Sequence, residues 1–426
     1  MRISACVITK NEEKNLPRWL ESMRGVADEM IVVDTGSSDG TVALAKAAGA
    51  HVFFFEWVDD FSAAKNFALD HATGDWILFL DADEYFSRDG GRKVRETLLA
   101  NHGNPEIEGF LFCLVNIDAD TGKKLGGRGG KLRCFRNVPW LRYVGRIHEQ
   151  LQDISGRTGM PGKILQYIPQ ILVYHTGYTQ SLMRQKIHRN LVLLQKLQED
   201  GKARPVDVVY LADCFYGLGE YEDAIDAARE AISRGTEPLG MANRPYTILI
   251  QSLLLANHPA AEVREALAAA VRRYPQIAEY RLFWGLFAWD CGEFDAAEEH
   301  FRRGFELCHI ANLRNVQDAM IEDNSIDLLP SAYFYMGELA HRKKRWEEAA
   351  YYFLESLKMD LQNPRTLRFY CQAMLLGDVS AEELGNALDA LYNTPEDRKF
   401  LHRVLGELAV QEQGDVPRRP FESKIK

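Results

Sequence analysis

The sequence predicts two folds in one chain: an α/β domain with a mostly parallel sheet, followed by an all-α domain of helical repeats. In the first 90 residues, short β-branched or apolar runs alternate with helical patterns, which is typical of βαβ units. From about residue 109, strand-like runs alternate with Gly-rich and basic loops, and beyond residue 200 nearly every segment has helical periodicity. The chain has 426 residues, enough for two or three domains of ordinary size.

The first four strands are short and strongly apolar. They are predicted at residues 3–8, 29–33, 51–55 and 76–80, with helices between them. Asn11 is placed to cap the first helix, whose apolar residues share one face. Further strands are predicted at 109–115, 131–136 and 164–174. An amphipathic pattern at 179–198 then leads out of the sheet, so we place the α/β domain at 1–180 and a linker helix at 181–200.

Residues 201–415 contain an internal repeat. Three segments share an aromatic residue at a turn before an Ala-containing helix, at Tyr221, Phe294 and Trp346. This order is that of a tetratricopeptide unit, whose period is roughly 34 residues. The aromatics are 73 and 52 residues apart, which indicates a degenerate turn at Pro259 and Ala260 and an insertion at 308–329. A generic helical bundle is the alternative. The Pro- and charge-rich tail at 416–426 is predicted to be loosely ordered.

Composition and charge exclude several classes of protein. With 46% hydrophobic and 26% charged residues, the chain is too apolar to be disordered throughout. A net charge of −10 without a long block of like charge argues against a nucleic-acid binder. The seven cysteines form no CxxC pair, as expected for reduced thiols in a cytoplasmic protein. No apolar run approaches the roughly 18 residues of a membrane span.

The most informative motif is a group of acids at the end of the fourth predicted strand. Asp81, Asp83 and Glu84 follow the apolar run 76–80, and ligands bind at the carboxyl ends of strands in open α/β sheets. Their mutual repulsion is costly unless cations or hydrogen-bond donors compensate it. A divalent ion such as Mg²⁺ or Mn²⁺ that also holds a diphosphate would do so. The alternative is an acidic turn that caps the next helix.

A second polar site follows the second strand, where Asp34 enters a Gly/Ser turn. An aspartate at that position can accept hydrogen bonds from a base or ribose, although Ser38 or Asp39 could simply cap the next helix. The first strand ends in Thr9-Lys-Asn-Glu-Glu, without the glycine fingerprint of dinucleotide-binding folds, and no P-loop motif occurs.

A basic segment interrupts this acidic chain. No acid occurs between residues 123 and 146, a stretch with Lys123, Lys124, Arg128, Lys131, Arg133, Arg136, Arg142 and Arg146. Such cations could neutralise the charge that develops on a diphosphate leaving group. Most fit a solvated hairpin, and we expect only Arg133 and Arg136 to reach the site.

Residues 3–13, 31–41, 64–69 and 76–86 together resemble the family-2 nucleotide-sugar glycosyltransferases with the A-type fold. The resemblance covers about the first 180 residues and is to the branch with a strand-end Asp-x-Asp-Glu, which includes the lipopolysaccharide-core glucosyltransferases. With the appended repeats, the chain also resembles the sublancin-type peptide S-glycosyltransferases. The resemblance implies an inverting, metal-dependent transfer of a sugar from a nucleotide-sugar donor, a UDP-sugar, with Mn²⁺ or Mg²⁺ as cofactor.

The same resemblance implies roles for particular residues. Thr9, Asn11 and Asp34 would line the nucleoside pocket, and Lys65 would approach the nucleotide. Asp83 would bind the metal directly, and Asp81 would contact the ribose or reach the metal through water. The role of Glu84 stays open.

The Ile-His-Glu segment at 147–149 and the later strand-end His175 also match this branch in order. An inverting transfer needs a base that takes the proton of the acceptor, a role for Asp, Glu or His. We assign it to Glu149, with His148 as a neighbouring catalytic candidate. His175 would complete the metal shell with Asp81 and Asp83.

The acceptor is less well defined by the sequence. A tetratricopeptide array offers an extended concave surface suited to a peptide or protein acceptor, but it serves equally for self-association into a homo-oligomer. A lipid-linked or cell-surface glycan acceptor stays open, as does a degenerate transferase domain that only binds nucleotide as part of a scaffold. A nucleotidyltransferase is disfavoured because the loop after Thr9 is not rich in Gly, Arg and Lys.

Overall fold

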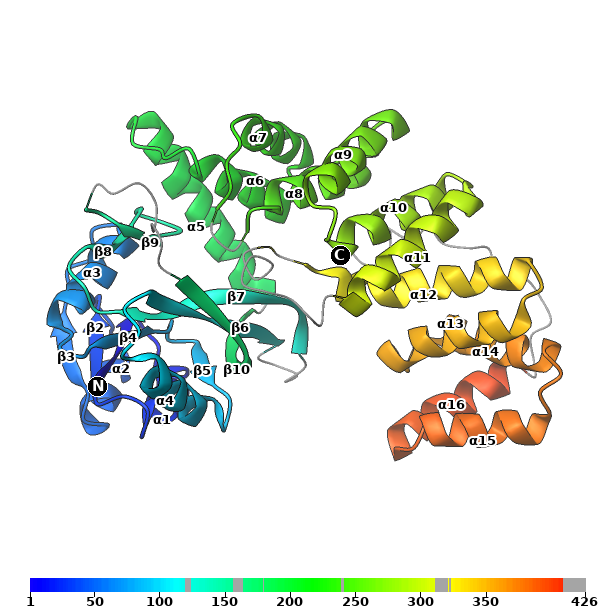
Figure 1. Ribbon diagram of the computed structural model, residues 1–426, viewed down its shortest axis with the longest axis horizontal. Coiled ribbons are helices and arrows are strands. Elements are labelled where there is room, and N and C mark those ends of the chain that lie inside the picture. Colours follow the sequence, from blue (N-terminus) through cyan, green and yellow to red (C-terminus); the bar gives the residue numbers. More distant parts are fainter. Residues whose placement is uncertain are drawn as a thin grey trace. The chain divides into compact units, whose positions relative to one another are not determined.

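The computed structural model describes residues 1–118, 124–155, 164–178, 180–238, 241–310, 321 and 323–408. The chain divides into two compact units, Met1–Ala256 with Arg314–Glu322 and Asn257–Leu313 with Asp323–Lys426 (Figure 1). The predicted tail at 416–426 and Lys123 lie outside the described residues.

The first unit is built on an eight-stranded sheet in the order β3-β2-β1-β4-β7-β6-β10-β5. Its strands are β1 (Ile3–Thr9), β2 (Glu29–Asp34), β3 (His51–Phe54), β4 (Trp76–Phe79), β5 (Glu84–Phe86), β6 (Ile107–Asp118), β7 (Lys124–Arg136) and β10 (Ile164–Tyr178), and β8 (Leu141–Val144) pairs with β9 (Gln150–Asp153) in a separate hairpin. Strands β3, β2, β1 and β4 are mutually parallel, whereas β7 runs antiparallel to both β4 and β6. The predicted α/β fold with a mostly parallel sheet is confirmed.

Helices cover both faces of this sheet, because successive residues of the buried strands point to opposite sides. The helices are α1 (Leu16–Met23), α2 (Thr41–Ala47), α3 (Phe61–His71) and α4 (Gly90–Asn101). Trp76 and Leu78 of β4 belong to a core that includes residues of α1 and α4. Ile77 and Phe79 belong to a core with residues of α3 and the β8–β9 hairpin. Alternate side chains of the buried strand β4 therefore contribute to two different hydrophobic cores, one on each face of the sheet.

The first helix begins later than predicted. The residue before α1 is Asn15, whereas Asn11 has a left-handed backbone with φ of +57°. The Oδ1 atom of Asn11 accepts a hydrogen bond from the Ser38 backbone at 2.8 Å. The prediction that Asn11 caps the first helix is therefore wrong, because its side chain ties two loops together instead.

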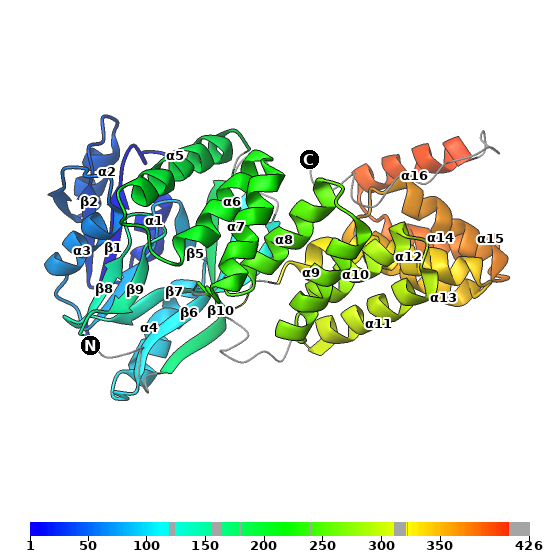
Figure 2. The same cartoon turned by 90° about the horizontal axis from the view of Figure 1, so that it is seen from above.

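Four helices complete the described part of the first unit. They are α5 (Gln180–Glu199), α6 (Asp207–Leu218), α7 (Tyr221–Ser233) and α8 (Arg244–Leu255). The domain end that we predict at residue 180 falls at the junction of β10 and α5, yet packing groups these helices with the sheet (Figure 2). One link is a buried cluster in which Ile147 contacts residues of α5 and α6, among them Leu194 and Tyr210.

The described part of the second unit is all-helical. It comprises α9 (Ala260–Arg273), α10 (Ala278–Asp290), α11 (Phe294–Ile310), α12 (Ser325–Arg342), α13 (Trp346–Met359), α14 (Pro364–Leu376), α15 (Ala381–Leu391) and α16 (Pro395–Leu408). The predicted turn aromatics Tyr221, Phe294 and Trp346 are the first residues of α7, α11 and α13, and Ala260 begins α9. The segment between α11 and α12, where we predict an insertion, lies mostly outside the described residues.

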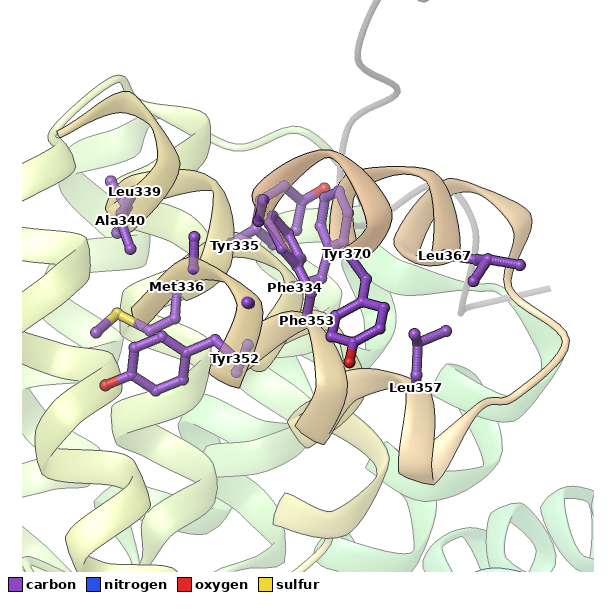
Figure 3. Packing of buried hydrophobic residues seen from close by; sticks show 14 of the residues in the cluster. Phe334, Tyr335, Met336, Leu339, Ala340, Tyr352, Phe353, Leu357, Leu367 and Tyr370 are labelled. Carbon is purple, nitrogen blue, oxygen red and sulfur yellow. The ribbon is translucent and has the colours of Figure 1, made fainter. Parts of the chain in front are cut away.

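The helix pairs of this unit approach closely at a repeated Gly–Phe contact. A Cβ on Gly285 would lie 2.5 Å from the Phe301 ring, and one on Gly337 would lie 2.6 Å from the Phe353 ring. Figure 3 shows Phe353 among the aromatic and aliphatic side chains of α12 to α14. These two glycines therefore allow neighbouring helices to pack closely, and the predicted all-α repeat fold is confirmed. Within the described residues no helix combines the length and the apolar character needed to cross a membrane.

Candidate active site

The candidate site lies where β1, β2 and β4 end. Because these strands are parallel, their carboxyl ends share one edge of the sheet. Thr9 and Asp34 are paired in register at the ends of β1 and β2, and both are buried. Asp81 and Asp83 lie in the turn between β4 and β5, and Glu84 is the first residue of β5.

Two cations contact Asp81. The Lys65 Nζ of α3 lies 3.1 Å from Asp81 Oδ1, and Arg133 Nη2 of β7 lies 2.9 Å from Asp81 Oδ2. Desolvation acts to raise the pKa of Asp81, but Lys65 and Arg133 outweigh it and hold the pKa of this carboxyl well below its usual range. Asp81 is therefore ionised and its charge is already compensated by the protein.

The sequence left the role of Glu84 open, and the structure shows that this residue binds Arg133 and the Asp81 backbone. Its Oε1 lies 2.5 Å from Arg133 Nη2, and its Oε2 accepts a hydrogen bond from the Asp81 backbone at 3.0 Å. Only 1% of Glu84 is exposed, and this burial raises the pKa of Glu84 despite the neighbouring Arg133. Arg133 thus holds Asp81 and Glu84 together, as a cation close to the predicted diphosphate position.

Asp83 pairs with His175 of β10. The distance between Asp83 Oδ2 and His175 Nε2 is 3.3 Å, and Lys186 Nζ of α5 lies 3.8 Å from the same oxygen. Burial acts to raise the pKa of Asp83, but the hydrogen bond with His175 lowers it below its usual value. Burial acts to lower the pKa of His175, and Asp83 reverses this so that the pKa is raised. Sequence reasoning missed Lys186 because no local pattern links α5 to β4.

The predicted metal triad of Asp81, Asp83 and His175 is not assembled as such. The described residues contain no group of three His, Cys, Asp or Glu side chains that could hold a metal ion. Both oxygens of Asp81 face cations, which leaves the carboxylate of Asp83 and the neutral form of the His175 imidazole as a donor pair. That pair fits an ion such as Mn²⁺ or Mg²⁺, which takes one or two protein ligands and fills its shell with substrate phosphate.

Glu149 joins the same cluster from a distant part of the chain. Its Oε1 lies 2.8 Å from Lys65 Nζ, so Lys65 bridges Glu149 and Asp81. The side chain of Lys65 is only 5% exposed, and the ion pairs raise its pKa although burial opposes them. Lys65 is therefore occupied by two carboxylates, and the structure does not show it free to approach a nucleotide.

His148 is turned away from this cluster. Its ring stacks on Tyr210 of α6 with a centroid distance of 3.9 Å and an angle of 9°. The left-handed backbone at His148, with φ of +49°, lets its side chain point differently from that of Glu149. The sequence-based prediction of a catalytic role for His148 is thus not supported by its position.

Arg136 is likewise not part of the site. Its guanidinium donates to the backbone oxygens of Ile107 at 2.7 Å and Asn104 at 2.7 Å, and it lies over the ring of Trp76. Trp76 begins β4, whereas Asp81 follows the opposite end of that strand. Arg133, in contrast, lies at an irregularity of β7, where the pairing with β6 shifts register between Phe110–Cys134 and Leu111–Leu132.

The candidate nucleoside residues form a hydrogen-bonded group of their own. Asp34 Oδ1 accepts hydrogen bonds from the backbone of Gly36 at 3.1 Å and Ser37 at 2.9 Å. Thr9 Oγ1 donates to Asp34 Oδ2 at 3.3 Å. The structure therefore brings Thr9 and Asp34 together, and Asn11 reaches the same turn through Ser37 and Ser38.

Sequence comparisons relate this chain to known proteins. Residues 4–103 match the family model "Glycosyl transferase family 2". A TPR repeat-containing protein of Synechococcus elongatus is 32% identical over 275 residues, which is 64% of this chain and 65% of that protein. The SPbeta prophage-derived glycosyltransferase SunS of Bacillus subtilis is 26% identical over 238 residues, 54% of this chain and 53% of that protein. An uncharacterised glycosyltransferase of Rickettsia typhi is 40% identical over 182 residues, 42% of this chain and 61% of that protein.

This chain therefore spans between about half and two thirds of the length of these curated relatives. Among solved structures, S. aureus TarS 1-349 in complex with UDP-GlcNAc matches 65% of this chain and 92% of that chain at 15% identity, with a TM-score of 0.35. MamA matches 50% of this chain and 98% of that chain at 14% identity, with a TM-score of 0.34. The family model covers β1, β2 and β4, with Asp34, Asp81 and Asp83. The chain thus contains a glycosyltransferase family 2 domain, which tetratricopeptide-like helical repeats follow.

Proposed function

We propose that this chain is an inverting glycosyltransferase that moves a sugar from a UDP-sugar to a peptide or protein acceptor, with Mn²⁺ or Mg²⁺ bound at Asp83 and His175. The observation that carries the proposal is the cluster of Asp81, Asp83, Lys65 and Arg133 at the carboxyl edge of a family 2 domain. Opposite charges are preorganised there beside a buried strand, and preorganised charge is the main means of stabilising a departing diphosphate.

The donor would bind across the ends of β1, β2 and β4. Thr9, Asn11 and Asp34 would line the nucleoside pocket, and Asp81 would orient the ribose. The ion, when bound, supplies positive charge to the diphosphate as the glycosidic bond breaks. Arg133 adds a fixed cation from the protein itself, held by the buried Glu84.

Glu149 is proposed as the base. The acceptor's nucleophilic atom would attack the anomeric carbon, its proton would pass to Glu149, and the bond from that carbon to the UDP oxygen would break with inversion. Lys65 holds the Glu149 carboxylate at 2.8 Å and so fixes its direction. In donor hydrolysis, water would take the place of the acceptor and lose its proton to the same group.

Glu149→Gln is therefore expected to lower the rate of donor hydrolysis by about 10² to 10⁴-fold, the usual contribution of a general base. The affinity for the UDP-sugar is expected to change little, because the proposed donor contacts are made by Thr9, Asn11, Asp34 and Asp81, whereas Glu149 pairs with Lys65. Stopped hydrolysis assays and calorimetric titration of the donor measure the two quantities. Glu96→Gln, at an exposed ion pair with Arg92, is the matched control. Undiminished hydrolysis by the Glu149 variant would show that another group is the base.

The helical repeats, which we predict over residues 201–415 and which include α6 to α16, are the proposed acceptor-binding part. Tetratricopeptide arrays bind extended segments along a concave surface, and this favours a peptide or protein over a lipid-linked glycan. The seven free cysteines favour a reducing compartment, and we place the protein in the cytoplasm. The repeats would equally allow a homo-oligomer.

A panel of UDP-sugars, each incubated with the purified protein in Mn²⁺ or in EDTA, tests the proposal. We expect one donor to be hydrolysed to UDP in the presence of Mn²⁺ and none in EDTA. Binding and turnover of no donor would instead favour a nucleotide-free scaffold whose working part is the repeats.

A further inference from the structure

We propose that Arg204, which precedes α6, is a positioning residue of the active site because it fixes the loop of residues 144–149 that presents Glu149 to Lys65. The inference rests on the proposed function of Glu149. Arg204 would thereby connect the helical part of the first unit to the active site at the edge of the sheet.

The guanidinium of Arg204 binds the backbone of this loop directly. Nη1 donates to the Val144 carbonyl at 2.8 Å, and Nη2 donates to the Ile147 carbonyl at 2.9 Å. Asp207 orients the guanidinium, because its Oδ1 accepts from Nε at 3.0 Å and from Nη2 at 2.6 Å. Asp207 is 1% exposed. The other oxygen, Oδ2, accepts from the Arg204 backbone amide at 2.8 Å, so the carboxylate holds both the main chain and the guanidinium of Arg204.

The loop has a glycine where the guanidinium approaches it. Gly145 has φ of +110°, and a Cβ at that position would overlap the guanidinium of Arg204. A side chain at residue 145 would therefore be strained by the backbone and would also displace Arg204. The loop and the arginine are fitted to each other.

Helix α3 holds the same loop from another direction. Ser62 Oγ donates to the Gly145 carbonyl, and the Phe61 backbone donates to the Arg146 carbonyl at 2.8 Å. Helix α3 also carries Lys65, the partner of Glu149. The loop is thus fixed between the helix that bears Lys65 and the segment that bears Arg204, which sets the position of Glu149.

Packing against α5 and α6 adds to this fixation. Ile147 is 3% exposed within the cluster that contains Leu194 and Tyr210, and His148 stacks on Tyr210. His148 also keeps a left-handed backbone, which persists only where the surroundings determine it. The working transferase therefore extends beyond the sheet, to α6 at least.

Arg204→Met in the full-length protein tests the inference. We expect kcat for UDP-sugar hydrolysis to fall about 100-fold, the effect of misplacing a catalytic group by about 1 Å. The dissociation constant of the donor and its binding stoichiometry should stay within twofold of the wild type. Hydrogen exchange should become faster at amides 141–151 and stay unchanged in β1 and β2. Arg234→Met, which removes an exposed ion pair with Glu230, is the matched control.

Gly145→Ala is the second variant, which keeps the arginine in the sequence but displaces its guanidinium from the loop. It should reproduce the loss of kcat and the faster exchange at 141–151. Gly49→Ala is its control, since Gly49 has φ of +80° but a Cβ there would have no other atom within 4 Å. The control carries the backbone strain without the collision.

The possible outcomes distinguish failure of the proposed transferase function from failure of the positioning role of Arg204. Wild-type protein that hydrolyses no donor contradicts the proposed function, whatever exchange shows at 141–151. Active wild-type protein whose kcat is unchanged in both Arg204→Met and Gly145→Ala contradicts only the positioning role. Loss of donor binding in step with kcat also contradicts it, because a general structural defect would then explain the loss.

Discussion

Asp83→Asn is expected to lower kcat for UDP-sugar turnover by about 1,000-fold, in the range found when a preorganised charge at a developing anion is removed. The carboxylate of Asp83 is 15% exposed and lies 3.3 Å from His175. Asparagine keeps the shape but loses the negative charge that a divalent ion prefers. The fold should survive, because the Asp83 backbone carbonyl still accepts the Thr176 amide at 3.0 Å.

The measurement is the initial rate of UDP release at saturating donor and Mn²⁺, for the wild type and the variant. His175→Gln should reduce the rate as well, since it removes the other donor of the pair. Asp70→Asn is the control, because Asp70 of α3 is 60% exposed and forms a surface ion pair with Arg142. An Asp83 variant as active as the Asp70 variant would contradict a role for Asp83 at the metal.

Arg133→Met is expected to destabilise the first unit by about 3–5 kcal/mol, the cost of leaving a buried charge without its partner. Glu84 is 1% exposed, and Arg133 is the cation that contacts it, at 2.5 Å. The double variant Arg133→Met/Glu84→Gln should recover much of this loss, because it removes the stranded carboxylate as well.

Hydrogen exchange of the β4 and β7 amides measures the free energy of unfolding of the first unit separately from that of the second unit. Arg92→Met is the control, since Arg92 and Glu96 are 67% and 58% exposed and such pairs contribute about 1 kcal/mol or less. Equal losses in Arg133→Met and Arg92→Met, or no recovery in the double variant, would disprove the buried network.

The edge of the sheet that carries the site could be predicted from the sequence because its signals are local. A run of apolar residues followed by Asp81 and Asp83 identifies both a buried strand and its carboxyl end. The same logic identifies Asp34 at the end of β2. The turn aromatics of the repeats are equally local, which is why Phe294 and Trp346 begin helices as expected.

The pairing of the site residues could not be predicted, because it depends on contacts between distant segments. Lys65 and Glu149 meet only because the loop after β8 packs on α3. Arg133 reaches Asp81 because β7 inserts beside β4 in the antiparallel sense. The sequence placed Arg136 in the same strand correctly but could not show that its guanidinium binds backbone carbonyls near the start of β4, away from Asp81.

His148 and Arg204 are two further residues whose contacts could not be predicted from the sequence. An Ile-His-Glu segment suggests two neighbouring catalytic groups, yet a left-handed backbone at His148 separates their directions. Arg204 carries no motif, and its contacts with Val144 and Ile147 arise only when α6 packs on the loop. Hydrogen bonds from a side chain to the backbone of a distant segment produce no periodic pattern in a sequence.

Binding of Mn²⁺ followed by electron paramagnetic resonance, with and without UDP, tests the central claim most directly. The claim is that Asp83 and His175 hold an ion shared with the diphosphate of the donor. It predicts about one bound Mn²⁺ per chain in the presence of UDP, much weaker binding without UDP, and at least 10-fold weaker binding in Asp83→Asn. Binding of Mn²⁺ that is equal in the wild type and the variant, or absent with UDP, would contradict the claim.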